Sequence, residues 1–345
     1  MDELTRLLDV ITPEIYLAYM NNFTKEKSAL ITSGVAVANA QVSANINSGG
    51  KIVHMPFWED LNGEEEILGD GDKALTTGKI TASQDQAAVL YRGKGWAVNE
   101  LAAVISGDRP MEALLSKIAS WWLRREQHTL VHGVLAGLFG SVTIDIPDED
   151  ETPVPTQFIG PLANSHMNDQ STKAISNDII LDSKQLLGDA SDQLSLLLMH
   201  SKIYTSLQKL GLVEYLPDVK GHPVIPSYLG YRVVVDDGCP VDKTDPAKPI
   251  FTTFLFRTGS IGRNSGHPSQ LTLWETARDA KRGNDEVYTR RALTLHPFGI
   301  KYNNMYFDDP TNVTPSNKDL ADPRNWNKVY EDKQIGIIAI KSLAV

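Results

Sequence analysis

Cysteine is almost absent from this sequence. Its 345 residues include one cysteine, Cys239. A single thiol cannot close a disulfide within the chain, and it cannot supply the several thiolates of a cysteine-based zinc site. We therefore expect a protein adapted to a reducing compartment, with Cys239 as a small residue in the turn that follows a strand.

Long apolar runs are missing as well. The most apolar windows are interrupted by charged residues and fall short of the roughly 20 residues that a membrane helix requires. The segment Met1-Asp2-Glu3 is acidic where a secretion signal would be basic. These absences predict a protein made and assembled in the cytoplasm, with no membrane partner.

An excess of positive charge is also lacking. The chain carries 33 Lys and Arg residues against 43 Asp and Glu residues, a formal net charge of -10. A dedicated nucleic-acid binder needs clustered cations for phosphate contacts, so this balance argues against one. The basic pairs are scattered and predict salt bridges instead: Arg124-Arg125, Lys281-Arg282 and Arg290-Arg291. The proportions of hydrophobic residues (41%) and charged residues (22%) are ordinary for a folded chain, and the length allows two or three compact units.

Metal-binding and acid–base motifs fail on inspection. His128 and His132 could share one face of a helix, but Thr129 stands where the metalloprotease motif needs Glu, so a packing or surface role is favoured. Asp236 and Asp237 are adjacent and would point to opposite faces of a strand end. We interpret them, with Gly238, as a turn rather than a pair of catalytic acids.

Loop motifs give the same answer. The Asp70-Gly71-Asp72 segment lacks the ligand ladder and closing Glu of a calcium loop, and the run 148–151 is typical of an exposed acidic loop. The turns at Gly93-Lys94-Gly95 and 259–263 match neither a phosphate loop nor a dinucleotide fingerprint, and no Gly-x-Ser-x-Gly elbow occurs. The sequence therefore predicts no catalytic, cofactor-binding or metal-binding residues, and no enzyme.

The N-terminal half is predicted to hold a long hairpin and a long helix. We expect helices at 2–9, 12–20, 98–105 and 110–139, and strands at 51–58 and 79–91. Gly93 and Gly95 are expected to end the second strand, and Gly140 the long helix. The acidic connection 59–78 makes the two strands an extended hairpin, which would be marginally stable without contacts outside itself.

The C-terminal half is predicted to be mixed. The acidic and Pro-containing run 148–155 marks a domain boundary. We expect helices at 183–187 and 191–210, strand and turn chemistry at 221–238, strands at 251–262, 286–295 and 334–340, and a loop-rich region at 303–323. Gly211 is expected to end the second of these helices.

The order of five segments is specific. Val224–Asp237 followed by Phe251–Gly262 resembles the major capsid (coat) proteins of tailed bacteriophages. Three further parts agree: Glu26–Gly34, the Trp121-Trp122 helix that ends in Gly137-Leu138-Phe139, and Asp322–Trp326. The resemblance covers most of the chain, and its specificity comes from order and combination rather than from one signature.

The resemblance implies the α+β Hong Kong 97-type phage capsid fold. Carried onto this chain, the family pattern gives an N-terminal arm (1–40), an extended E-loop hairpin (41–97), a peripheral domain with a long spine helix (98–145), an axial domain (146–285) and return strands of the peripheral domain (286–345). Some members crosslink a hairpin lysine to a neighbour. Lys73 and Lys79 lie in the predicted hairpin, but no residue here matches that site, and the activity is not carried over.

The implied function is a head shell. Copies of the chain would form hexamers and pentamers that close into an icosahedral capsid around double-stranded DNA, without sequence-specific binding and without cofactors. Arm and hairpin would lie over neighbouring subunits, and portal, scaffolding and decoration proteins are further candidate partners. The protein would assemble in the host cytoplasm and reside in the virion. Two alternatives remain open at this point: an encapsulin-like compartment shell of the same fold, and a soluble enzyme that forms a small oligomer with a deep polar pocket.

Overall fold

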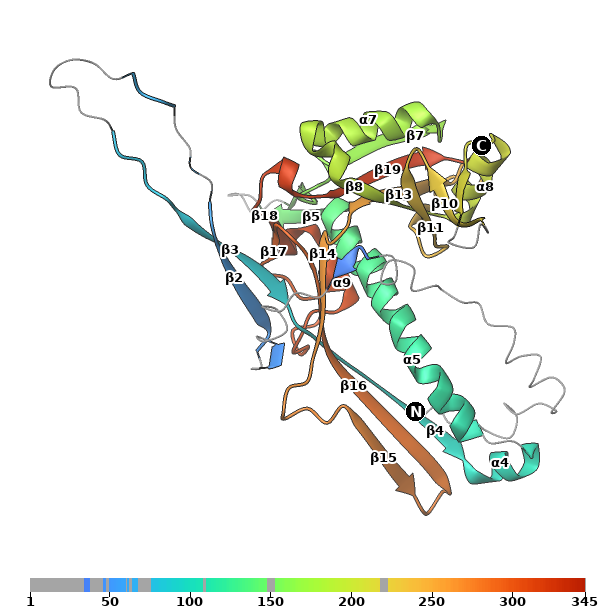
Figure 1. The fold of residues 1–345 in the computed structure, drawn as a ribbon. Helices are drawn as coiled ribbons and strands as arrows, with labels where there is room; N and C mark the ends of the chain where they lie inside the picture. Colours follow the sequence, from blue (N-terminus) through green and yellow to red (C-terminus); the bar gives the residue numbers. More distant parts are fainter. Residues whose placement is uncertain are drawn as a thin grey trace.

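The computed structural model describes residues 34–37, 46–47, 50–59, 61, 64–67, 76–107, 110–147, 153–217 and 223–344. The expected helices at 2–9 and 12–20, most of segment 26–34, Asp70-Gly71-Asp72, Lys73 and the acidic residues 148–151 lie outside these ranges. Figure 1 shows an elongated molecule: a hairpin projects from one side, a long helix and a long strand run downward together, and a second sheet with its helices forms the upper part.

The long helix predicted for residues 110–139 is confirmed. It runs without interruption as α5 (Pro110–Thr129), a π-helical segment η2 (Leu130–Leu135) and α6 (Ala136–Phe139). Gly140 follows in an extended conformation and ends it. At 1.5 Å per residue, thirty residues span about 45 Å. The short helix α4 (Glu100–Ser106) precedes it, close to its predicted place.

One sheet lies along this helix. In the described residues its strand order is β1 (Ala36–Val37), β14 (Ile261–Gly266), β16 (Asn284–Pro297) and β15 (Trp274–Asp279), with β4 (Leu90–Asn99) also paired to β16. The strand predicted at 286–295 is therefore correct and is the longest of the sheet. Its first half pairs with β4 and β15, and its second half pairs with β14.

A second sheet forms the upper part of the molecule (Figure 1). Its order is β7 (Met167–Ala174), β19 (Ile337–Leu343), β13 (Ile250–Arg257), β8 (Leu194–Met199), β11 (Tyr231–Val235), β10 (Pro223–Tyr228) and β9 (Glu214–Pro217), with β12 (Val241–Asp242) on β13. Three two-stranded ribbons complete the fold: β2 (Ile52–Trp58) with β3 (Ala82–Ala88), β5 (Ser141–Pro147) with β6 (Pro153–Ile159), and β17 (Ile300–Tyr302) with β18 (Trp326–Lys328).

The helix predicted for residues 191–210 is wrong in its first half. The chain forms α7 (Asn177–Lys184), a 3₁₀ segment η3 (Gln185–Gln193), strand β8 and then α8 (Ser201–Lys209). Leu196 and Leu198 pack in one hydrophobic cluster and Leu197 in another, on opposite faces of the sheet. A strand buried on both faces has a continuous apolar run, which periodicity alone cannot distinguish from a buried helix.

The strand predicted for residues 79–91 ends in the wrong place. β3 stops at Ala88, and β4 begins at Leu90 and passes through Gly93 and Gly95 as far as Asn99. A Cβ at Gly95 would lie 2.8 Å from the ring of Tyr288 on β16. The glycine therefore marks a close approach of two strands instead of a strand end.

Two segments expected to return together to one domain lie in different sheets. β16 belongs to the sheet along the long helix, whereas β19 lies between β7 and β13 in the upper sheet. Of the stretch 221–238, the described part from residue 223 begins with a hairpin of β10 and β11, which turns at Leu229 and Gly230, both with positive φ. Gly211, also with positive φ, ends α8 as expected. Region 303–323 is mostly loop and contains α9 (Asn317–Ala321), with η4 (Pro323–Asn325) and η5 (Asp332–Gln334) after it.

Candidate assembly surfaces

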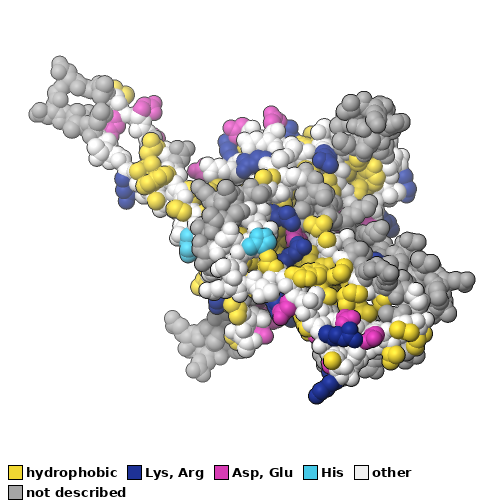
Figure 2. Space-filling model, turned by 60° about the horizontal axis from the view of Figure 1, so that its bottom comes forward, with side chains coloured by type: hydrophobic (Ala, Val, Ile, Leu, Met, Phe, Trp, Pro, Cys, Tyr) yellow, Lys and Arg dark blue, Asp and Glu magenta, His cyan; other side chains and the backbone are white. Residues whose placement is uncertain are grey.

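The β2–β3 hairpin projects from the body and carries exposed apolar side chains (Figures 1 and 2). Trp58 is 68% exposed, Leu61 74%, Ile67 84% and Ile80 54%. A two-stranded ribbon is marginally stable alone, and exposed apolar groups of this size mark contacts with other molecules. The hairpin therefore has the character of a docking arm rather than of a self-contained unit.

The same hairpin is acidic beyond its paired part. Glu59, Glu64 and Glu65 are exposed, and Glu59 accepts a hydrogen bond from the hydroxyl of Thr81 at 2.5 Å. Glu66 accepts from the backbone N–H of Thr76 at 3.3 Å across the ribbon. These hydrogen bonds join the two sides of the connection between β2 and β3. The exposed carboxylates leave negative charge on its surface.

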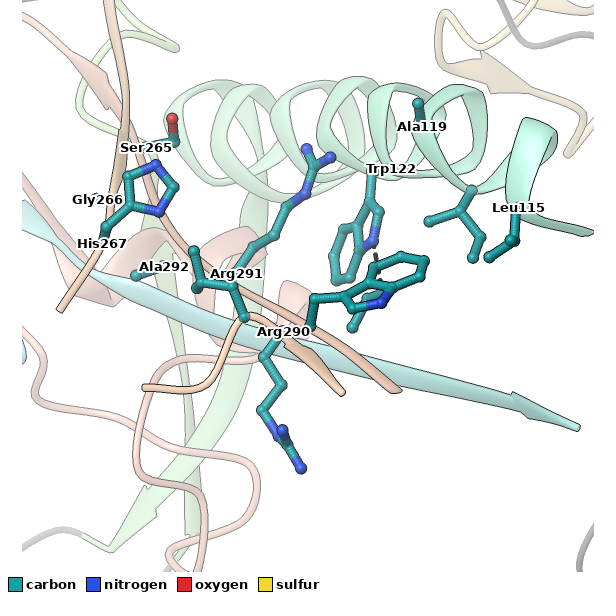
Figure 3. Close-up of a pocket in the computed structure, with 13 residues that line it drawn as sticks. Leu115, Ala119, Trp122, Ser265, Gly266, His267, Arg290, Arg291 and Ala292 are labelled. Atoms are coloured by element: carbon teal, nitrogen blue, oxygen red, sulfur yellow. Dashed lines mark hydrogen bonds between the residues drawn. The ribbon is translucent and has the colours of Figure 1, made fainter. Parts of the chain in front are cut away.

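A groove separates α5 from the sheet beside it (Figure 3). Its volume is about 480 Å³, and its walls include Leu115, Ile118 and Trp122 from the helix and Trp274 from β15. The indole Nε1 of Trp122 donates a 3.0 Å hydrogen bond to Oγ1 of Thr289 and so ties helix to strand. The groove is apolar at its base and holds no cluster of reactive side chains.

The arginines beside the groove pair with carboxylates of the same chain. Glu126 on α5 is 4% exposed and accepts hydrogen bonds from Arg263 at 2.6 Å and Arg291 at 3.0 Å. The guanidinium of Arg291 also lies 5.1 Å from the centre of the Trp122 ring. Arg290 pairs with Glu275 at 3.1 Å and Arg282 with Asp279 at 3.4 Å, so the predicted salt bridges are confirmed for Arg282, Arg290 and Arg291. No local pattern points to Glu126, because its partners come from two distant strands.

β15 is an edge strand. It pairs with β16 on one side, and no other described strand pairs with it. Trp274 is 48% exposed on this edge. Open strand edges are templates for pairing with another chain, and charged residues such as Glu275 and Arg278 restrain uncontrolled pairing.

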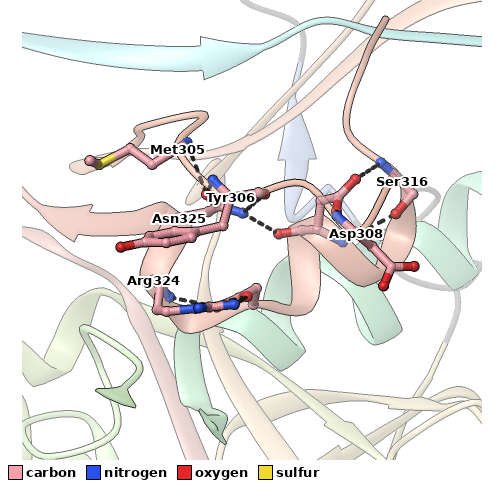
Figure 4. A network of polar contacts seen from close by, with 8 residues as sticks. Met305, Tyr306, Asp308, Ser316, Arg324 and Asn325 are labelled. Atoms are coloured by element: carbon pink, nitrogen blue, oxygen red, sulfur yellow. Dashed lines mark hydrogen bonds and ion pairs between the residues drawn. The ribbon is translucent and has the colours of Figure 1, made fainter. Parts of the chain in front are cut away.

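The loop between β17 and α9 is held by a network of polar contacts (Figure 4). The amide of Asn325 donates to the carbonyl of Tyr306 at 2.8 Å and to that of Asp319 at 2.9 Å. Asp319 accepts from the backbone N–H of Asp308 at 2.6 Å and of Ser316 at 2.7 Å.

The same loop exposes apolar side chains among its polar ones. Arg324 lies 4.1 Å from the Tyr306 ring and pairs with Asp322. Met305, at 67%, and Val313, at 62%, remain exposed. The network therefore presents apolar side chains on a fixed loop, which again suits contact with another molecule.

The two histidines considered as metal ligands on the long helix lie against each other. His128 and His132 stack with ring centres 4.6 Å apart, and Asn317 lies 3.4 Å from His128 Nδ1. Within the described ranges, no three His, Cys, Asp or Glu side chains are arranged to hold a metal ion. Over the same residues, no helix has the length and apolar character to cross a membrane.

The turn interpretation of residues 236–238 is confirmed. Asp236 is 3% exposed and accepts from the backbone N–H of Gly238 at 2.9 Å and from the amide of Gln127. Asp237 accepts instead from the backbone N–H of Ser201 at 3.2 Å, so the two carboxylates serve different partners. Cys239 follows, 3% exposed, and burial raises the pKa of its thiol well above the ordinary value.

A known protein is similar along almost the whole chain. No family model matches. The major capsid protein of Bacillus phage SPP1 is 33% identical over 339 residues, which cover 98% of each chain. This chain belongs to the phage major capsid proteins. The major capsid protein is thus a structural component of the virion that forms the phage head shell, as predicted, and the compartment-shell and enzyme alternatives are not favoured.

Solved structures agree on the fold of this major capsid protein. The capsid of Ralstonia phage GP4 superposes with a TM-score of 0.59 at 12% identity and covers 94% of this chain and 93% of that one. The capsid of a native GTA particle gives 0.50 at 11% identity over 94% and 93%. Mycobacterium phage Bobi gives 0.50 at 11% over 93% and 92%. The expected Hong Kong 97-type fold is therefore confirmed, with mixed α and β structure.

Proposed function

We propose that this major capsid protein forms hexamers and pentamers, which close into an icosahedral shell around double-stranded DNA without sequence-specific contacts. The net charge of -10 supports a wall that does not adhere to the packed polyanion. The projecting hairpin carries the proposal: four large apolar side chains on a ribbon without a described layer beneath it need a neighbouring subunit as their cover.

The proposed division of the chain starts from the family pattern: the arm 1–40, the E-loop hairpin 41–97, the peripheral domain with the spine helix 98–145 and the axial domain 146–285. Sheet membership changes it in two ways. Of the return segment 286–345, we assign β16 to the peripheral domain and β19 to the axial domain, because β19 pairs with β7 and β13. We also assign β4, β14 and β15 to the peripheral domain, because all three pair with β16.

Further contacts are proposed on the same basis. Portal, scaffolding and decoration proteins are candidate partners at the shell. We propose no catalytic, cofactor-binding or metal-binding residues. The described polar clusters support this, because Glu126, Asp236 and Asp319 are each occupied by structural hydrogen bonds.

Electron microscopy of the purified protein tests the proposal. Closed shells, or rings with six-fold and five-fold symmetry, are the expected result. A chain that stays monomeric under all assembly conditions would contradict it.

A deletion isolates the hairpin. Replacing residues 59–78 with a short Gly-Ser link should leave far-UV circular dichroism and thermal unfolding of the body nearly unchanged and abolish shells. The milder change Trp58→Ser with Ile67→Ser should act in the same direction. Leu210→Ser is the matched control, because Leu210 is 47% exposed at the C-terminal end of α8 and lies outside the hairpin. Normal shells from the deletion would refute the role given to the hairpin.

A further inference from the structure

The root of the projecting hairpin contains a buried acid. Asp85 lies on β3 and is 1% exposed. One carboxylate oxygen accepts from Nε2 of His296 at 2.9 Å and from the backbone N–H of Gly299 at 3.0 Å. The other oxygen accepts from the N–H of Gln86 at 2.8 Å. His296 is itself 1% exposed, so the pair is sealed from water.

Asp85 differs from the other described side chains of β2 and β3 in its hydrogen-bond partners. Among the described residues, it is the one side chain of β2 or β3 that hydrogen-bonds outside the ribbon. Its partners lie at the end of β16 and in the turn before β17, on the body of the molecule. A buried hydrogen bond to a charged group is strong and directional, so this contact can fix an angle as well as a position.

An aromatic contact supports the polar one. Tyr330 packs edge-on against Phe57 of β2, with ring centres 4.7 Å apart. The same ring lies against Gly299, where a Cβ would be 2.7 Å away. Gly299 has a positive φ of 86°, so the turn that offers its N–H to Asp85 depends on glycine twice.

Apolar packing also holds the base of the hairpin, where Val53 and Ala87 lie in one buried cluster with Ala292 of β16. β3 ends at Ala88 and β4 begins at Leu90, so one residue, Val89, joins the ribbon to the sheet along the helix. Val89 donates its N–H to the carbonyl of Lys51 at 2.9 Å, a bond within the base of the ribbon itself. Hydrophobic packing is non-directional, so it holds the base of the hairpin in place without specifying an angle, which a buried hydrogen bond can do.

We propose that the contact of Asp85 with His296 and Gly299 is a latch that sets the direction in which the β2–β3 hairpin leaves the body. The latch acts within one chain and does not require the hairpin to touch a neighbour. In a chain with this latch, the hairpin already has a fixed direction before assembly. This lowers the conformational entropy that is lost when the hairpin contacts a neighbouring subunit.

Distances between two spin labels test the latch. Thr77→Cys places one label on the exposed connection of the hairpin, and Asp182→Cys places the other on the exposed face of α7. The buried Cys239, with its raised thiol pKa, stays unlabelled in the folded protein. Pulsed electron paramagnetic resonance is recorded on unassembled chains, and on shells in which labelled chains are diluted with unlabelled ones.

The parent should give one narrow distance distribution. Asp85→Ala and His296→Leu should each at least double its width, whereas His296→Gln, which keeps a side-chain N–H donor, should restore most of the narrow peak. Asp236→Ala is the matched control, because Asp236 is an equally buried acid that accepts a backbone N–H away from the hairpin. Its distribution should stay narrow.

Two results would overturn the latch. One is an unchanged distribution in Asp85→Ala and His296→Leu. The other is equal broadening in Asp236→Ala, since that would mean general loosening. If Asp85→Ala does not fold, the test rests on the widths of the distance distributions of His296→Leu and His296→Gln. The readout is separate from shell formation, so a failed hairpin–neighbour contact and a failed latch are distinguished.

Discussion

Gly137 lies against Trp326 so closely that a Cβ on the glycine would be 2.5 Å from Nε1 of the indole. The same Cβ would be 2.2 Å from the carbonyl oxygen of Leu320, which accepts the 2.7 Å hydrogen bond from that Nε1. The end of the long helix is therefore packed directly onto the backbone of α9 and the indole of Trp326. Two segments almost two hundred residues apart in sequence form one joint.

Gly137→Ala should weaken this joint. The added methyl group meets backbone and a hydrogen-bonded ring, neither of which can move away, so we expect a loss of about 2–3 kcal/mol in the free energy of unfolding. Chemical denaturation of the unassembled chain measures it. Gly133→Ala is the control: its Cβ would meet side-chain atoms of Leu320 at 3.2 Å and the carbonyl oxygen of Asn317 at 3.7 Å, and the better helix propensity of alanine offsets part of the strain. Equal losses in the two variants would contradict this account.

Glu126→Gln should destabilise the contact between the long helix and its sheet. It removes the charge that balances Arg263 and Arg291, whose side chains are 31% and 34% exposed. Partial exposure of the arginines softens the loss to about 2 kcal/mol, below that of a fully buried pair. Glu275→Gln, which alters an exposed pair with Arg290, should cost less than about 1 kcal/mol. Urea denaturation measures the loss of unfolding free energy in both variants, and equal losses would contradict this prediction.

Acid should destabilise the fold through His166. Burial lowers the pKa of His166 below its ordinary value of 6.5, and this outweighs the opposing effect of Asp332, whose carbonyl accepts from Nε2 at 3.0 Å. The unfolded chain therefore binds a proton more readily than the folded one below that value. The contribution of His166 to stability is complete above pH 6.5 and is lost as the pH falls toward the lowered pKa.

His166→Gln separates this effect from other titrations. Glutamine can still donate to the Asp332 carbonyl but does not titrate. The drop in unfolding free energy between about pH 7.5 and pH 5.5 should be smaller in the variant than in the parent. Parallel stability curves for the two proteins would show that His166 has no part in the acid sensitivity.

Leu197→Ala tests whether residues 194–199, predicted to be helical, form the strand β8. Leu197 is 0% exposed at the centre of the upper sheet, so its truncation should cost about 2–5 kcal/mol. Leu186→Ala, at a residue 41% exposed, should change stability by about 0.5 kcal/mol or less. Hydrogen exchange provides a second measurement: amides of β8 should be among the slowest in the chain. Rapid exchange there would contradict a central strand.

Much of the architecture could be predicted because its signals are local. The apolar spacing from Met111 to Leu138 follows a helical period, and Gly140 ends it, so the long helix needed no tertiary information. In the hairpin strands around Met55 and Ala87, more buried and less buried side chains alternate as expected for a ribbon. The glycines at 93 and 95 led to a wrong prediction of where the second strand ends. Gly95 leaves room for Tyr288, a close approach that no local pattern reports.

The sequence by itself determined the long helix, the projecting hairpin, the absence of a recognisable reacting motif and, through the order of its segments, the capsid family. Only the tertiary structure decided that residues 194–199 are a strand, because their leucines are buried on both faces of a sheet whose other strands come from distant parts of the chain. It also decided where β19 belongs, and it brought Asp85 to His296 and Glu126 to its two arginines. Charge pairs of this kind depend on distance in space, and a linear pattern carries no measure of that distance.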